Sequence, residues 1–146
     1  MTSDPPITYR RKPPSRLDTA RLESFAAEIR KRVLAGRHFH CLITGDKESQ
    51  ELNRRFRRKN YATDVLSFPA AEGTGGELAV SLARARAQAK EFGHSVEDEL
   101  CVLMLHGALH LAGMNHETDG GEMARAEARW RKKLGLPRGL IARVSV

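Results

Sequence analysis

Three histidines near the carboxyl terminus follow the spacing His-x-x-x-His-x-x-Gly-x-x-His over residues 106–116. His106 and His110 are four residues apart, so on a helix they lie one turn apart on the same face, within reach of one metal ion. Gly113 can adopt a positive φ that other residues resist, so it can end the helix and turn the chain back. His116 can then reach the same ion. Three protein nitrogens leave one position of a tetrahedral zinc ion open for water, which is typical of a catalytic site.

The residue after the first histidine argues against one class of zinc enzyme. Metzincin proteases share this spacing, but glutamate directly follows their first histidine and acts as the general base. Gly107 stands at that position here, and glycine cannot take a proton. The sequence therefore keeps the metal ligands of a protease and lacks its base.

Length and composition predict a small enzyme. The 146 residues are expected to form one domain over 1–146, with flexible ends at 1–6 and 138–146. No apolar run approaches the roughly 18 to 20 residues of a membrane span, and the first residues lack the basic and apolar segments of a secretory signal. Cys41 and Cys101 stand alone in apolar runs, as expected of small buried hydrophobes in a reducing compartment. We therefore expect a cytoplasmic protein without membrane contact.

The net charge of +7 indicates an anionic partner. Aromatic residues make up only 5% of the chain, so binding should depend on phosphate charge more than on base stacking. The densest basic cluster lies at 54–59 and is predicted to bind phosphates: Arg54, Arg55, Arg57, Arg58 and Lys59. Two further groups occur along the chain: Arg10, Arg11, Lys12 and Arg16, then Arg129, Arg131, Lys132 and Lys133.

The apolar periodicity predicts alternating strands and helices. Strands are expected at 7–10, 39–44, 65–68 and 77–81, the third stopped by Pro69, with a flexible loop over 70–76. A first helix is expected over 22–33, ended by Gly36, and a second after Gly45, with Leu52 and Phe56 facing inward. Two more are expected over 82–92, ended by Gly93, and over 123–134, ended by Gly135.

The helix that carries His106 should be buried. Ser95 with Asp98 three residues on is a typical N-cap pattern, and residues 100–105 are apolar on every side. The expected fold is an α+β domain: a small mixed β-sheet of about four strands packed against about five helices. The metal site lies at the carboxyl-terminal end of the central buried helix.

Longer motifs accompany the histidines. They are Leu52-Asn-x-x-Phe-Arg57, Thr63-Asp-Val-Leu-Ser-Phe-Pro69 and Gly76-Glu-Leu-Ala-Val-Ser81. With them the chain resembles, over about 52–136, the bacterial YbeY-type endoribonucleases, also called ribosomal RNA maturation factors. The resemblance implies a zinc-dependent, single-strand-specific endoribonuclease that trims the 3′ end of small-subunit ribosomal RNA and acts in ribosome quality control. Its implied partners are ribosomal RNA and the ribosome, and DNA is not expected.

The resemblance also assigns residues. The family's zinc ligands correspond to His106, His110 and His116, and its functionally important arginine corresponds to Arg57. Two positions depart from the family pattern: Asn115 stands where the family usually has aspartate, and Glu77 where its Gly-Asp-Ile has aspartate. Asn115 keeps hydrogen bonding but loses the charge, and Glu77 keeps the acid with one more methylene.

Phosphodiester cleavage requires stabilisation of negative charge on phosphate oxygens. A metal ion can polarise such an oxygen or activate a water, and a planar guanidinium such as that of Arg57 can hold the same phosphate. The sequence identifies no general base. Glu77 and Glu99 are candidates, the latter because it lies seven residues before His106 on the same helical face. Two alternatives stay open: a metal-dependent hydrolase of another substrate, such as a metalloprotease, and a non-catalytic ribosome-binding factor with a structural metal.

Overall fold

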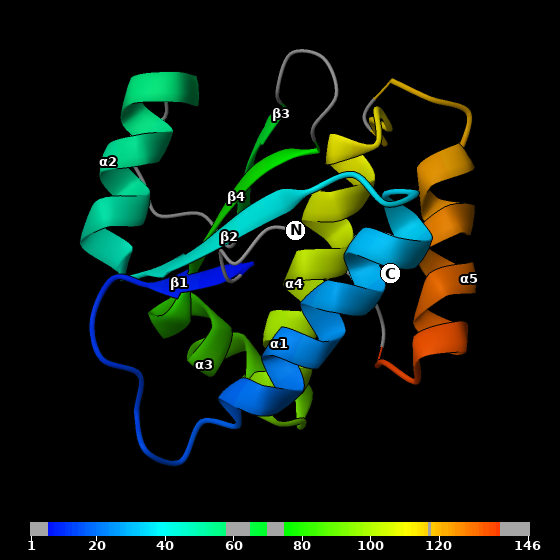
Figure 1. The fold of residues 1–146 in the computed structure, drawn as a ribbon. Helices are drawn as coiled ribbons and strands as arrows, with labels where there is room; N and C mark the ends of the chain where they lie inside the picture. Colours follow the sequence, from blue (N-terminus) through cyan, green and yellow to red (C-terminus); the bar gives the residue numbers. More distant parts are fainter. Residues whose placement is uncertain (1–5, 58–64, 70–74, 117, 138–146) are drawn as a thin grey trace.

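A computed structural model describes residues 6–57, 65–69, 75–116 and 118–137 (Figure 1). The elements follow in the order β1 (Ile7–Tyr9), α1 (Thr19–Glu28), a π-helical turn η1 (Ile29–Val33), β2 (Phe39–Thr44), α2 (Asp46–Arg57), β3 (Val65–Pro69), β4 (Gly76–Ser81), α3 (Leu82–Phe92), α4 (Val96–Leu111) and α5 (Glu122–Leu134). The ends predicted to be flexible lie outside the described residues apart from Pro6, as does most of the predicted loop over 70–76.

The strands form one mixed sheet in the order β1-β2-β4-β3. β1, β2 and β4 are parallel, and β3 pairs with β4 in the antiparallel direction. In this register Cys41 lies between Ile7 and Leu78, and Phe68 lies opposite Glu77. The predicted α+β class, with a small mixed sheet and five α-helices, is confirmed for the described residues.

Helix α4 lies at the centre of the fold. Figure 1 shows α1, α4 and α5 on one side of the sheet and α2 on the other. The alternating apolar residues of the strands, such as Ile43 and Val80, join the core against α4. Every residue of α4 from Glu99 to Leu109 is buried, as its continuous apolar run predicts. A helix buried in this way holds the side chains near its carboxyl end in a fixed place.

The structure differs from the prediction in one helix. The continuous helix expected over 22–33 ends as an α-helix at Glu28 and continues as the π-helical turn η1. There the Leu34 N–H donates to the Ile29 carbonyl at 3.0 Å, five residues back. In an α-helix residues five apart point in different directions, whereas a π turn brings them onto one face. Because Ile29 and Leu34 are both fully buried, the wider turn places both in the core.

Most other element ends lie within one residue of the prediction: β3 includes Pro69, which was expected to stop it, and β4 begins at Gly76, which was expected to end the loop. The hydroxyls of Ser81 and Ser95 cap α3 and α4 by accepting from the N–H of Arg84 and of Asp98, and Gly93 ends α3 with a φ of 73°. Cys41 and Cys101 are free and buried, and burial raises the pKa of both thiols to about 12. Among the described residues, no helix is both long and apolar enough to cross a lipid bilayer.

Candidate metal centre

The carboxyl end of α4 brings the three predicted ligands together. His106 and His110 lie in the last turns of α4, and His116 lies in the loop that follows. The ring centroids are 4.9 Å apart for His106 and His110, and 5.3 Å and 5.5 Å from His116 to these two. One ligand atom from each residue lies within 4.8 Å of the others. The described residues contain no other such group of histidine, cysteine and carboxylate side chains.

The turn after α4 explains how the third histidine returns. Gly113 has a φ of 97°. The N–H of Gly113 donates to the His110 carbonyl at 2.9 Å, and the N–H of Met114 donates to the Leu109 carbonyl at 3.1 Å. These two bonds form a Schellman motif, in which a glycine with positive φ ends the helix and reverses the chain. The role predicted for Gly113 is confirmed.

Hydrogen bonds orient two of the imidazole rings. His110 Nδ1 lies 2.9 Å from the Met114 carbonyl oxygen, which can only accept, so this nitrogen carries the proton. His106 Nδ1 lies 2.7 Å from Oε2 of Glu127 and donates to that carboxylate. With both Nδ1 atoms used in this way, Nε2 is the nitrogen through which each ring can bind a metal ion.

The sequence analysis missed Glu127, whose carboxylate accepts from His106 in this centre. His106 and Glu127 are almost completely buried, with exposed fractions of 7% and 3%. A carboxylate that accepts from a metal-binding histidine fixes the tautomer and makes the ring a stronger ligand. Glu127 lies within the apolar stripe of α5 formed by Met123, Ala126 and Trp130. A charged residue within an apolar stripe was the signal that could have identified it.

The position after His106 has no room for a side chain. A Cβ atom on Gly107 would lie 2.6 Å from Cδ2 of Leu78 and 3.1 Å from Cγ2 of Val65, on two neighbouring strands. In addition, the Ser67 hydroxyl donates to the Gly107 carbonyl at 3.3 Å. The glycine thus lets α4 lie close against β3 and β4. The position that carries the general base of a metzincin protease is filled here by the sheet itself.

The structure places neither candidate general base beside the histidines. Glu99 lies about 10 Å before His106 along the helix axis, is fully buried, and contacts Nε2 of His94 at 2.6 Å. Glu77 is 70% exposed and lies 3.7 Å from Nδ1 of His40. Its neighbour Leu78 faces α4, so the side chain of Glu77 projects from the opposite face of the sheet.

The basic cluster at 54–59 is only partly described. Arg57 is the last residue of α2, and its side chain lies outside the described residues, as do Arg58 and Lys59. Arg54 forms an ion pair with Glu51 on the same helix, and Arg55 is exposed. In Figure 1 the carboxyl ends of α2 and α4 point toward the same end of the molecule. Binding of phosphate by this cluster therefore remains a prediction.

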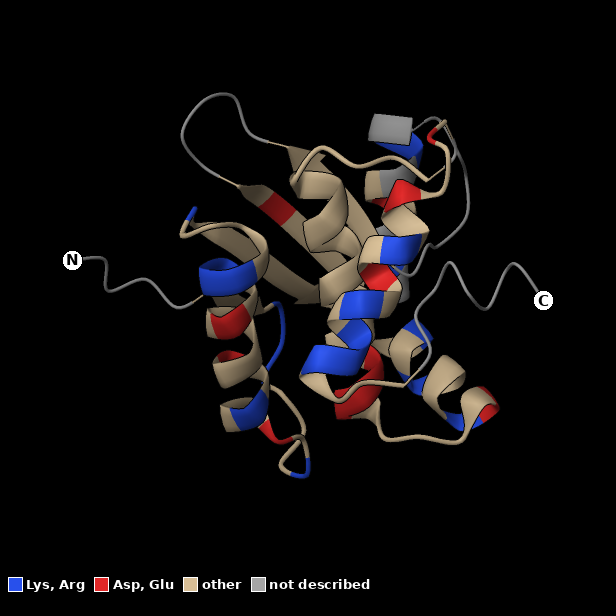
Figure 2. Ribbon diagram, turned by 90° about the vertical axis from the view of Figure 1, so that its right-hand side faces the viewer, with Lys and Arg blue, Asp and Glu red and all other residues tan. Residues whose placement is uncertain are grey.

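The basic group at the end of α5 has local partners. Figure 2 shows lysines and arginines gathered in the carboxyl-terminal half of this helix, including Arg131, Lys132 and Lys133 in its last turn. Cations there compensate the negative end of the helix dipole. Lys133 also lies 5.1 Å from the ring centre of Trp130, and Arg32 of η1 lies 5.6 Å from it.

Comparisons with known proteins agree with these observations. The family model described as Endoribonuclease YbeY matches residues 11–135. A protein of Solibacter usitatus named Endoribonuclease YbeY is 57% identical over 94% of this chain and 93% of its own length. A protein of the same name from Koribacter versatilis is 48% identical over 85% of this chain and 82% of its own length. A solution structure from Thermotoga maritima has a TM-score of 0.59 and 30% identity, and the match covers 85% of both chains. The chain therefore belongs to the Endoribonuclease YbeY family.

Proposed function

We propose that this protein is a zinc-dependent endoribonuclease that cleaves single-stranded RNA, and that its substrate in the cell is ribosomal RNA. The observation that carries the proposal is the convergence of three imidazoles, two of which are oriented by hydrogen bonds within the protein. Nδ1 of His106 and of His110 is bonded to an acceptor, and the ligand atoms of His106, His110 and His116 lie within 4.8 Å of one another. The membership in an endoribonuclease family supplies the reaction class.

The donor set suits zinc. Three neutral imidazole nitrogens with one position left for water are the usual ligands of a catalytic zinc ion. When bound there, the ion would supply Lewis-acid stabilisation of phosphate charge and a nucleophilic water near neutral pH. His106 and His110 would bind through Nε2, and Glu127 would hold His106 in the required tautomer.

Arg57 is the proposed phosphate-binding residue. Its guanidinium would neutralise charge that develops on the phosphate during cleavage, a contribution that typically amounts to several kcal/mol. We expect Arg57→Ala to keep its zinc and its fold and to lose most of its cleavage of RNA. Zinc content, thermal unfolding and single-turnover rates measure the three properties. Cleavage within about twofold of the unchanged protein, which is well under 1 kcal/mol, would remove Arg57 from the mechanism.

The proposal for the biological setting rests on the resemblance to the family. We propose that the protein matures the 3′ end of small-subunit ribosomal RNA, acts in ribosome quality control and works in the cytoplasm with the ribosome as its partner. Peptide cleavage is disfavoured because Gly107 has no room for the glutamate of a metzincin: a Cβ would lie 2.6 Å from Leu78 Cδ2.

The test is single-turnover cleavage of ribosomal RNA and of a peptide by zinc-loaded protein. His110→Ala, prepared in parallel, controls for contaminating nucleases. We expect cleavage of RNA only, and none by the variant, which should also lack zinc because binding needs all three ligands. RNA cleavage that persists in His110→Ala, or a protein with zinc and no cleavage, would contradict the proposal. The second result would favour a ribosome-binding factor with a structural metal.

A further inference from the structure

Two adjoining hollows lie far from the histidine triad. The first, of about 460 Å³, is at the carboxyl ends of β1 and β2, where α2 and α3 begin. The second, also about 460 Å³, lies between residues 14–17 and the first turn of α4. Arg86 of α3 lines both, so the two are adjacent; we call them the basic hollows. Glu97 lines the second hollow, and at about 1.5 Å per residue it is about 20 Å from His110 along α4.

The charges of the first hollow are strongly unequal. Its basic lining residues are Arg10, Arg11, Lys12, Lys47 and Arg86, and among the described residues Glu48 is the one acid that lines it. Glu48 is already engaged: Arg10 Nε donates to it at 3.0 Å, Arg10 Nη2 lies 2.7 Å from its other oxygen, and the Thr44 hydroxyl also donates to it. Most of the positive charge of this hollow is therefore available to an anion.

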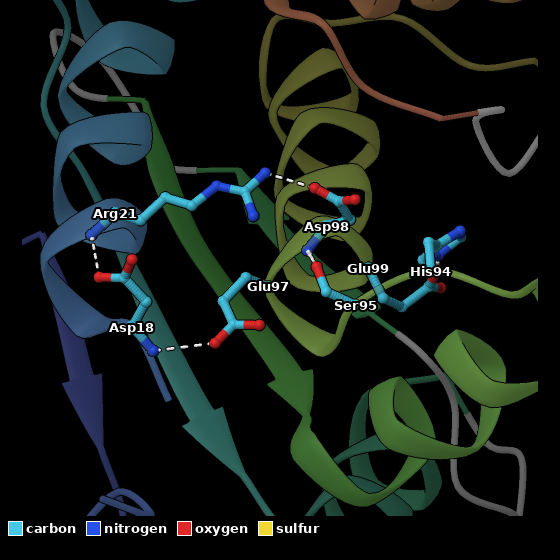
Figure 3. A network of polar contacts seen from close by, with 7 residues as sticks. All are labelled: Asp18, Arg21, His94, Ser95, Glu97, Asp98 and Glu99. Carbon is cyan, nitrogen blue, oxygen red and sulfur yellow. Dashed lines mark hydrogen bonds and ion pairs between the residues drawn. The ribbon is translucent and has the colours of Figure 1, made fainter. Parts of the chain in front are cut away.

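The segment that carries part of this charge is fixed in place. Residues 10–18 join β1 to α1, and two prolines at 13 and 14 restrict their backbone. At its start the Arg10 N–H donates to the Ile43 carbonyl at 2.9 Å. At its end the Asp18 N–H donates to the Glu97 carboxylate at 2.9 Å, and Arg21 pairs with Asp98, as Figure 3 shows. These contacts tie the segment to the first turn of α4.

The position in the fold also favours an anion. In open sheets, ligands bind in the crevice beyond the carboxyl ends of parallel strands, where successive connections leave toward opposite faces. β1 leads to α1 on one face and β2 leads to α2 on the other (Figure 1). The amino ends of α2 and α3 lie at this edge and add the partial positive charge of their helix dipoles.

We propose that the basic hollows form a second RNA-binding surface, which holds backbone phosphates of a single-stranded segment away from the cleavage site. Two hollows that share Arg86 suit a polymer with repeated charges better than a single phosphate ion. The excess of basic over acidic residues in the first hollow suits the repeated negative charge of an RNA backbone. The choice of RNA rests on the proposed function.

The experiment compares two double variants of the full chain. Lys12→Gln/Arg86→Gln removes two charges from the basic hollows. Lys31→Gln/Lys90→Gln removes two exposed charges elsewhere, one of them also on α3. Binding of a single-stranded RNA is measured over a salt series with EDTA present, so that cleavage does not occur. Circular dichroism and thermal unfolding establish that each variant is folded.

Each phosphate contact to a single strand contributes about 0.7 to the slope of log affinity against log salt. We expect the hollow variant to lose about 1.4 of slope, which is about 25-fold in affinity at 0.1 M salt, and the matched variant to keep the slope of the unchanged protein. Equal slopes for the two variants would overturn the proposal. Binding of poly-glutamate, a probe for an acidic protein, is measured in the same way. If the hollow variant loses binding to poly-glutamate but not to RNA, the proposal is overturned and the occupant is an acidic protein. Because binding is measured without metal, a failure of zinc-dependent cleavage would leave this result standing.

Discussion

The two ends of helix α4 each hold an imidazole–carboxylate pair whose carboxylate is buried, and the pairs differ in the ring nitrogen that they use. At the amino end, Nε2 of His94 contacts Glu99 at 2.6 Å (Figure 3). At the carboxyl end, Nδ1 of His106 contacts Glu127 at 2.7 Å. Both carboxylates are almost completely buried. In the first pair, Nε2 of His94 is bonded to the carboxylate within the protein. In the second pair, Nδ1 makes this bond, so Nε2 of His106 can bind a metal ion together with the other two histidines.

The largest expected effect concerns the amino-terminal pair. Glu99→Ala leaves His94 without its partner and leaves a cavity in place of a fully buried side chain, and truncations of large buried side chains typically cost about 2–5 kcal/mol of folding free energy. Zinc affinity should be unchanged, since Glu99 is about 10 Å from His106 along the axis. Urea unfolding of the metal-free protein and zinc titration measure the two properties. A loss of zinc affinity without a loss of stability would break the comparison.

The carboxyl-terminal pair should give the opposite result. Glu127→Gln removes the charge that holds His106 and should lower zinc affinity about 10- to 100-fold, the usual effect of losing such a partner. Glu99→Gln is the matched control and should bind zinc as the unchanged protein does. Competition with a zinc chelator gives both affinities. If the two variants bind zinc equally well, Glu127 is only a structural residue.

A smaller effect is expected where α4 contacts the sheet. Gly107→Ala places a methyl group 2.6 Å from Leu78 Cδ2 and should cost about 1–3 kcal/mol, as overpacking of a core usually does. Leu78→Val in the same chain removes part of the clash, so the double variant should be more stable than the sum of the single changes. Urea unfolding of the unchanged protein, the two single variants and the double variant completes the double-mutant cycle. Additive losses would mean that another contact of Gly107 is responsible.

The smallest expected effect concerns Glu48 in the first basic hollow. Hydrogen bonds from Arg10 and Thr44 hold the pKa of Glu48 below its ordinary value of about 4.3. A lowered pKa stabilises the fold above the ordinary value, and this contribution is lost as the pH falls through the pKa of the folded state. The pair is partly exposed, so Glu48→Gln should cost about 0.2–1 kcal/mol near pH 6 and less near pH 3. Thermal unfolding at the two pH values tests this, and a difference that grows toward pH 3 would contradict the assignment.

Local sequence signals predicted most of the framework. Ser95 and Gly93 mark element ends through bonds with residues close in sequence, and apolar alternation identified β2 and β4. The placement of His106, His110 and Gly113 at one helix end was also predicted from a short stretch of sequence. These features depend on spacings of one or two turns, which the sequence displays directly.

The errors concern relations that sequence spacing does not contain. Glu99 shares a helical face with His106, but two turns separate them along the axis, so a shared face did not mean a shared site. Glu127 reaches His106 only because α5 packs against α4, and the two residues are 21 positions apart. The π turn at η1 arose from the need to bury Ile29 and Leu34 together, a tertiary requirement that helical periodicity does not express.

The short turn after α4 has a consequence for the rate at which a bound ion would leave. The carbonyl of Met114 orients His110, and the same turn carries His116 back to the centre. An opening that breaks the Met114 N–H bond to Leu109 would therefore release one ring and remove the support of another in a single event. Departure of the ion would then follow local unfolding of the turn after α4 rather than the successive loss of independent ligands. Exchange of the Met114 amide with deuterium reports that opening directly.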